Sequence, residues 1–117
     1  MKLLAAALLL AVLLLITGQS PAHFKPGTVH NREHAITVAF CGSVKPCSLG
    51  EKALQVAYCE SGPSLWPWAT NGIYWGMLQV SDHWRATVPG WAWNPWAQAR
   101  HGYRVWRLVG WGHWSCA

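Results

Sequence analysis

Acidic residues are scarce in this 117-residue chain, which has four Asp and Glu against nine Lys and Arg and a formal net charge of +5. Chemistry that needs several carboxylates therefore has few candidates. The sequence also lacks a basic run or a nucleic-acid recognition module, so we expect no nucleic-acid partner. The modest positive charge suits a partner that carries carboxylates or phosphates, such as a cell wall or a membrane surface.

Strand patterns are almost absent as well, because no sizeable set of alternating apolar and polar residues occurs. One short hairpin signal lies at Asn71-Gly72, which is followed by Ile73, Tyr74 and Trp75. The other periodic segments favour helices. We therefore predict a mainly α domain, a small helical fold with at most one short hairpin.

Residues 1–22 have the pattern of a secretory signal peptide. Lys2 precedes an apolar run from Leu3 to Ile16, and small residues before Ala22 offer a cleavage site there, with Gly18 as the alternative. The run is shorter than the roughly 20 residues of a membrane span, so an uncleaved anchor is the weaker reading. We expect a secreted protein, extracellular or cell-wall associated, with no stable membrane anchor after cleavage.

The rest of the chain is expected to form one small domain. Residues 23–32 are predicted to be a mobile lead-in and residues 33–117 the folded domain, which we expect to be a monomer. A domain of this size is marginal on core burial alone.

All four cysteines follow the apolar run, and an even number in a short exported chain favours two disulfides. Three pairings are possible. We favour Cys41–Cys47, which closes a tight loop, with Cys59–Cys116, because closing the long loop stabilises most. Zinc is the alternative, but no C-x-x-C spacing supports it, and we expect no metal.

Three segments carry start and stop signals of helices. The first is expected to have Asn31 as its N-cap, and a short one is expected from Ser81 to about Val88. The last begins at the N-cap and N1 pair Asn94-Pro95 and stops at Gly110. Its predicted buried face comprises Trp96, Ala99, Tyr103, Trp106 and Val109.

The stretch Ser48–Gly62 has the most consistent helix pattern. Ser48 and Glu51 form an S-x-x-E capping box, and Gly62 favours the helix end. The apolar stripe of Leu49, Ala53, Val56 and Ala57 continues to Glu60. Burial and the negative end of the helix dipole would both disfavour the ionised form of this carboxylate, which suits a general acid. The simpler alternative is a glutamate that turns to solvent.

Ten tryptophans lie between Trp66 and Trp114, more than a core of this size requires. Five of them fall in predicted loops, where flat apolar rings with a polar N–H edge match the faces of sugars. Packing under the loops and insertion into a membrane interface are the alternatives. The loop tryptophans are Trp66, Trp68, Trp75, Trp91 and Trp93.

Several motifs together resemble a known family. They are Ala53-Leu-Gln-Val-Ala-Tyr-Cys-Glu-Ser61, Asn71-Gly72, Gly76-Met-Leu-Gln79, Asn94-Pro95 with Gln98, and Gly110-Trp-Gly-His-Trp-Ser-Cys116. This set is similar to the lysozyme-like superfamily, specifically the small exported transglycosylase SLT-type domains of bacteria and their phages. The resemblance extends from about Ala35 to Cys116.

The resemblance implies an enzyme that cleaves the β-1,4 bonds of peptidoglycan glycan strands without a cofactor. Glu60 would be the general acid and later the base, and Ser61 would help to orient it. Gln79 and the Gly76–Met77 backbone would line the sugar subsite, and the cysteine before Glu60 would pair with the terminal one. Residues expected to bind the substrate are Ser61, Asn71, Tyr74, Gly76, Met77, Gln79, Trp68 and Trp75.

The carboxylate inventory favours a mechanism with one glutamate. A hydrolase of the usual kind needs two carboxylates beside the scissile bond. Glu51 is assigned to the capping box, Glu33 lies in the first helix, and a helix-dipole role explains Asp82. We therefore expect a lytic transglycosylase, with a water-using lysozyme-type hydrolase and a non-catalytic, Trp-rich glycan-binding or membrane-active protein as alternatives.

Overall fold

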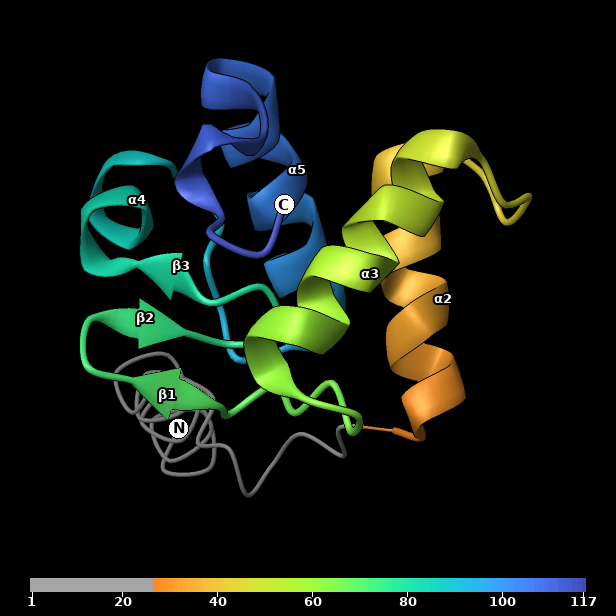
Figure 1. Cartoon of the computed structure of the whole chain (residues 1–117), viewed down its shortest axis with the longest axis horizontal. Helices are drawn as coiled ribbons and strands as arrows, with labels where there is room; N and C mark the ends of the chain where they lie inside the picture. Colours follow the sequence, from red (N-terminus) through yellow and green to blue (C-terminus); the bar gives the residue numbers. More distant parts are fainter. Residues whose placement is uncertain (1–26) are drawn as a thin grey trace, which may run out of the picture.

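The computed structural model describes residues 27–117, which form a small, mainly α domain (Figure 1). The predicted signal peptide lies outside the described residues. Within residues 27–117, no helix has the length and apolar character needed to cross a membrane. The helices are α2 (Val29–Cys41), α3 (Ser48–Ser61), α4 (Asp82–Thr87), α5 (Pro95–Val109) and the short 3-10 helix η2 (Gly110–His113). The strands are β1 (Thr70–Asn71), β2 (Tyr74–Trp75) and β3 (Val80–Ser81).

Helix α2 begins earlier than predicted. Its N-cap is Thr28, whose hydroxyl accepts a hydrogen bond from the backbone N–H of Asn31, so the assignment of Asn31 as the cap is wrong. Residues 29–32, expected in the lead-in, are helical. The side chain of Arg32 supports this start, because it donates to the carbonyls of Ser64 and Gly27 at 3.0 and 2.7 Å.

Helix α3 follows the predicted range, but its cap differs. Cys47 is the N-cap, and its sulfur accepts from the Gly50 N–H at 3.3 Å, whereas Ser48 is the first helical residue. The predicted capping box is therefore wrong, because the disulfide holds the Cys47 sulfur over the first turn. At the other end Gly62 has a positive φ of 87°, as the sequence indicated.

The sheet is antiparallel, with the order β1-β2-β3. The predicted hairpin is confirmed, since Asn71 pairs with Tyr74 across a two-residue turn. One more strand, β3, pairs Ser81 with Tyr74 and leads directly into α4.

The core lies where α2, α3 and α5 meet the segment that carries the sheet. Helix α2 packs against both α3 and α5, and the predicted fold class is confirmed (Figure 1). The fully buried residues include Ile36, Val56, Met77, Leu78 and Val105.

The predicted buried face of α5 is only partly correct, because this helix is covered from two sides. Tyr103 and Trp106 contact Phe40 of α2. The opposite side carries Gln98, His101, Gly102 and Val105, all buried, and Gly102 leaves room for Leu78. Trp96 and Val109 are exposed.

Both predicted disulfides are present, Cys41–Cys47 and Cys59–Cys116, and no free cysteine remains among the described residues. The first joins the end of α2 to the start of α3, and the second joins the end of α3 to the last residues of the chain. Two disulfides are consistent with an extracellular protein.

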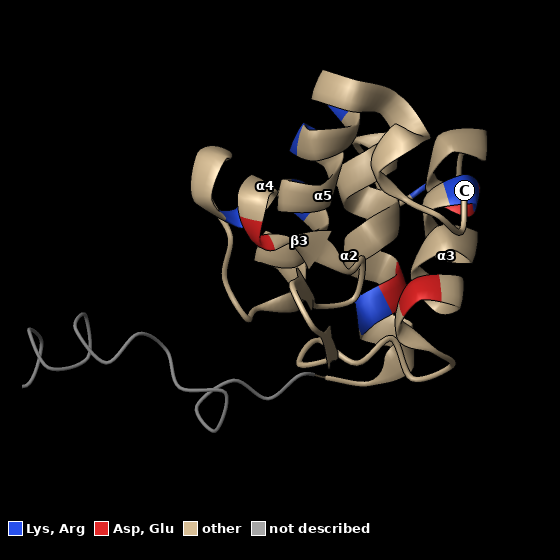
Figure 2. Cartoon of the chain, turned by 60° about the vertical axis from the view of Figure 1, so that its left-hand side comes forward, with Lys and Arg blue, Asp and Glu red and all other residues tan. Residues whose placement is uncertain are grey.

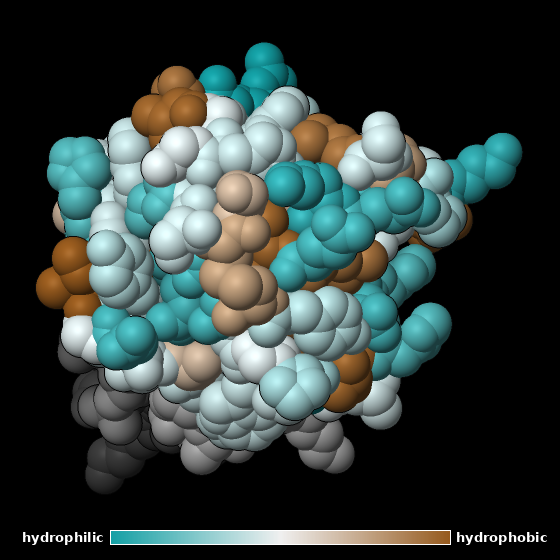
Figure 3. Space-filling model, in the orientation of Figure 1, coloured by the Kyte–Doolittle hydropathy of each residue, from teal (hydrophilic) through white to brown (hydrophobic). Residues whose placement is uncertain are grey.

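Charged residues are few and scattered over the helices (Figure 2). The face seen in Figure 3 is a mosaic, in which strongly hydrophobic residues form separate patches between polar ones. No single large apolar surface dominates this face.

Candidate functional site

Glu60 lies half-buried in the last turn of α3, next to the end of the chain. The Cys59–Cys116 disulfide holds the terminal segment against this turn. The backbone N–H of Cys116 donates to Glu60 Oε1 at 3.2 Å, and the Ser115 hydroxyl approaches the same oxygen at 3.5 Å. The carboxylate is thus oriented by residues more than fifty positions away in the sequence.

Beside this carboxylate lies a small cleft with a volume of about 180 Å³. Helix α3 supplies its acid, the hairpin supplies an amide and a phenol, and the turn before β3 and the chain terminus supply the rest. Every lining side chain carries a polar group. The cleft residues are Glu60, Asn71, Tyr74, Gln79, His113 and Ser115.

Four residues proposed from the sequence therefore meet in one place: Glu60, Asn71, Tyr74 and Gln79. Asn71 and Tyr74 face each other in the register of the hairpin, and both are exposed. Gln79 has a positive φ of 48°, and its amide nitrogen donates to the carbonyls of Gly76 and Ala69 at 2.8 and 3.1 Å. This residue braces the turn while it lines the cleft.

His113 and Ser115 complete the cleft and were not proposed from the sequence. Both belong to the Gly110–Cys116 motif. The predicted bond from Cys116 to Cys59, the neighbour of Glu60, was the signal that could have placed this motif beside the carboxylate. His113 Nε2 lies 3.4 Å from the backbone carbonyl of Gln79. Burial lowers the pKa of His113, while the Gln79 carbonyl and the Glu60 charge oppose the shift, so a neutral imidazole is favoured at pH 7.

Three other predicted site residues have structural roles instead. The Ser61 hydroxyl donates to the Ala57 carbonyl at 2.9 Å, so it does not orient Glu60. The Met77 N–H donates to the side-chain oxygen of Gln98 at 2.9 Å, and Gly76 packs against Gln98 so closely that a Cβ would not fit. The Gly76–Met77 backbone is therefore committed inside the domain and does not line the cleft.

Trp68 and Trp75 are half-buried in aromatic clusters and do not line the cleft. Trp68 packs edge-on against Trp66, with ring centroids 4.8 Å apart. Trp75 packs against Trp93 and lies under the guanidinium of Arg85, 4.3 Å from its ring centroid. Their indole N–H groups are buried without an acceptor in the described part of the chain. The packing alternative describes these two rings better than an open sugar platform does.

The remaining acids do not reach the cleft. Asp82 pairs with Arg85 at 3.0 Å on the exposed side of α4. Glu33 lies beside Tyr58, where burial and this carboxylate raise the pKa of the phenol. Glu51 lies in the first turn of α3, at the opposite end of the helix from Glu60. Glu60 is the one carboxylate of the described chain that lines the cleft.

The arrangement can transfer a proton to or from a group held in the cleft, with Glu60 as the acid or base and neutral polar groups around it. Among residues 27–117, no group of three or more His, Cys, Asp or Glu side chains could hold a metal ion. Comparisons with models of protein families, with curated proteins and with solved structures found no match to this chain.

Proposed function

We propose that this protein is an exported enzyme that cleaves the β-1,4 glycosidic bonds of peptidoglycan glycan strands, in the manner of a lytic transglycosylase. The observation that carries the proposal is the single carboxylate in a polar cleft, Glu60, held by hydrogen bonds to its Oε1. The motifs that resemble SLT-type domains, the disulfides and the leader pattern support the same assignment.

In the proposed reaction Glu60 works twice. It first donates its proton to the glycosidic oxygen, and the bond from that oxygen to C1 of the muramic acid breaks. The C6 hydroxyl of the same sugar then attacks C1 and returns its proton to Glu60. The product is a 1,6-anhydro sugar, and no water enters the reaction. One carboxylate suffices for this sequence, whereas a hydrolase of the usual kind needs two.

The other cleft residues would hold the sugar. Asn71 and Tyr74 offer an amide and a phenol at the open side, and the neutral imidazole of His113 can accept or donate one hydrogen bond. The cleft, at about 180 Å³, is smaller than the roughly 300–1,000 Å³ of typical ligand sites. It would therefore hold only the ring next to the scissile bond, and the strand would continue across the surface as a solvated chain.

The decisive variant is Glu60→Gln, which keeps the shape of the side chain and removes its acid. We expect soluble muropeptide release from purified cell walls to fall at least about a hundredfold, because general acid catalysis typically contributes 10²–10⁴-fold. Glu51→Gln, a matched change at the other end of α3, should retain wild-type activity. Equal activity of wild type and Glu60→Gln would refute the proposal.

Product masses separate the alternatives. Anhydro ends would support the transglycosylase, and reducing ends would indicate a water-using hydrolase with the same acid. If wild type and Glu60→Gln bind cell walls equally well and neither releases products, the protein would be a glycan-binding module.

A further inference from the structure

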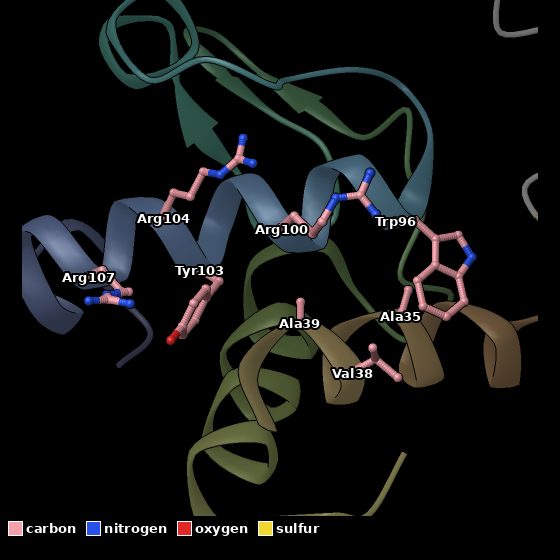
Figure 4. A pocket seen from close by; sticks show the side chains of 8 residues that line it. All are labelled: Ala35, Val38, Ala39, Trp96, Arg100, Tyr103, Arg104 and Arg107. Carbon is pink, nitrogen blue, oxygen red and sulfur yellow. The ribbon is translucent and has the colours of Figure 1, made fainter. Parts of the chain in front are cut away.

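A second hollow lies between α2 and α5, away from the residues of the Glu60 cleft. Its volume is about 430 Å³, within the range of small-molecule sites. Figure 4 shows Ala35, Ala39 and Tyr103 pointing into the space between the two helices, with Val38 on the near side of α2 and Trp96 at one end. We call this hollow the α2–α5 groove. Its lining is completed by Arg100, Arg104 and Arg107.

The three arginines follow one another along the same side of α5, at a spacing of four and then three residues. At 1.5 Å per residue they span roughly 10 Å. Arg104 donates to the Pro89 carbonyl at 2.9 Å and points away from α2 (Figure 4). Arg107 lies with its guanidinium 6.0 Å from the ring centroid of Tyr103. Arg100 and Arg107 are therefore the cations available at the groove.

No carboxylate offsets this charge. None of the groove residues is acidic, and the one ion pair between described residues joins Arg85 to Asp82 on α4. Cations beside an apolar hollow are complementary to a ligand that has an anionic group next to an apolar body.

An exposed aromatic ring lies at one end of the groove. Trp96, at the start of α5, is 38% exposed and lies on the same side of this helix as Arg100 and Arg107. An indole ring and arginines on one helix surface are typical of segments that lie at the boundary of an anionic bilayer.

We propose that the α2–α5 groove binds an anionic lipid of a bilayer surface, with the acyl chain on the floor of Val38 and Ala39 and the headgroup between Arg100 and Arg107. A protein helix is a poorer match, because two turns of a helix about 10 Å thick occupy more space than the roughly 430 Å³ of this hollow. Bound in this way, the protein is held at a membrane surface without a spanning segment.

The test is vesicle flotation, with wild type and variants purified identically so that any retained leader contributes equally. Vesicles contain phosphatidylcholine alone or phosphatidylcholine with one fifth phosphatidylglycerol. Wild type should bind the anionic vesicles at least tenfold more tightly. Arg100→Gln with Arg107→Gln should weaken this binding about thirtyfold, because two arginines near an anionic surface are lost. The double change Lys45→Gln with Lys52→Gln, which removes the same charge elsewhere, should cost less than about threefold.

A second variant tests the apolar floor. Val38→Asp places a carboxylate on the half-buried groove side of α2, and it should also reduce binding at least tenfold. Circular dichroism and thermal melting check that each variant is folded. Equal loss in the arginine and lysine pairs, or unchanged binding by Val38→Asp, would overturn the proposal in favour of unspecific charge attraction. Tighter binding of a deca-glutamate peptide than of anionic vesicles, with the same arginine dependence, would overturn it in favour of an acidic protein partner.

Discussion

Removal of the Cys59–Cys116 disulfide is expected to cost stability and to displace the segment that holds Glu60. The bond joins positions separated by 57 residues, whereas Cys41 and Cys47 are separated by 6. The two bonds allow an internal comparison within one small domain, because each can be removed separately by changing its two cysteines to serine. Serine at position 47 keeps an oxygen at the N-cap of α3, where the sulfur of Cys47 now accepts from Gly50.

The expected magnitudes follow from the entropy of loop closure in the unfolded chain. For the long loop the chain-entropy relation gives about 4 kcal/mol, and for the short loop about 2 kcal/mol. The variant without Cys59–Cys116 should therefore unfold with a free energy about 2 kcal/mol lower than the variant without Cys41–Cys47.

Urea unfolding followed by tryptophan fluorescence measures both free energies at one pH and temperature. Wall cleavage, measured where both variants are folded, should fall further without Cys59–Cys116, because the Cys116 N–H and Ser115 then no longer hold Glu60 Oε1. A short-loop variant that is destabilised as much as the long-loop variant, or more, would refute this reasoning.

Two further predictions concern buried polar groups. Burial lowers the pKa of His101 below its ordinary 6.5, as it does for His113. Near this pH the unfolded chain therefore binds more protons than the folded chain does, and the folded state should lose stability as the pH falls through 6.5. The urea midpoint should drop between pH 7.5 and 5.5, less so in His101→Gln, and a midpoint that rises over this interval would contradict the assignment. Gln98→Leu removes the partners of the Met77 N–H and the Pro67 carbonyl and should cost about 2–4 kcal/mol of unfolding free energy. Gln55→Leu, at an exposed position of α3, should change it by less than about 0.5 kcal/mol in the same urea assay; similar losses in both would show that Gln98 is dispensable.

Much of the fold follows from local signals. Asn94 and Pro95 begin α5 because an asparagine oxygen accepts from the Trp96 N–H and proline needs no donor there. The hairpin at Asn71-Gly72 follows from the turn preference of this pair. A local signal gave the wrong residue where a distant group determined the structure. Cys47, and not Ser48, is the N-cap of α3, because the disulfide to Cys41 in α2 holds the Cys47 sulfur near the Gly50 N–H.

The candidate site divides in the same way. Periodicity alone put Glu60 on the inner side of its helix, and cysteine arithmetic favoured the bond that ties this helix to the chain terminus. Neither could show that Ser61 bonds to Ala57 or that the Met77 N–H is used by Gln98. Each of these is a choice between nearby acceptors, which depends on the final distances between packed side chains.

Neighbouring residues alone were enough to predict the helix that carries Glu60 and its end at Gly62. The even number of cysteines indicated two disulfides, and the entropy of loop closure favoured Cys59–Cys116 among the three possible pairings. The packing of the helices, in contrast, brings His113 and Ser115 into one polar cleft with Glu60, and it places arginines of α5 beside an apolar hollow on α2. Such contacts join residues far apart in the chain, and their geometry arises only when the helices pack together.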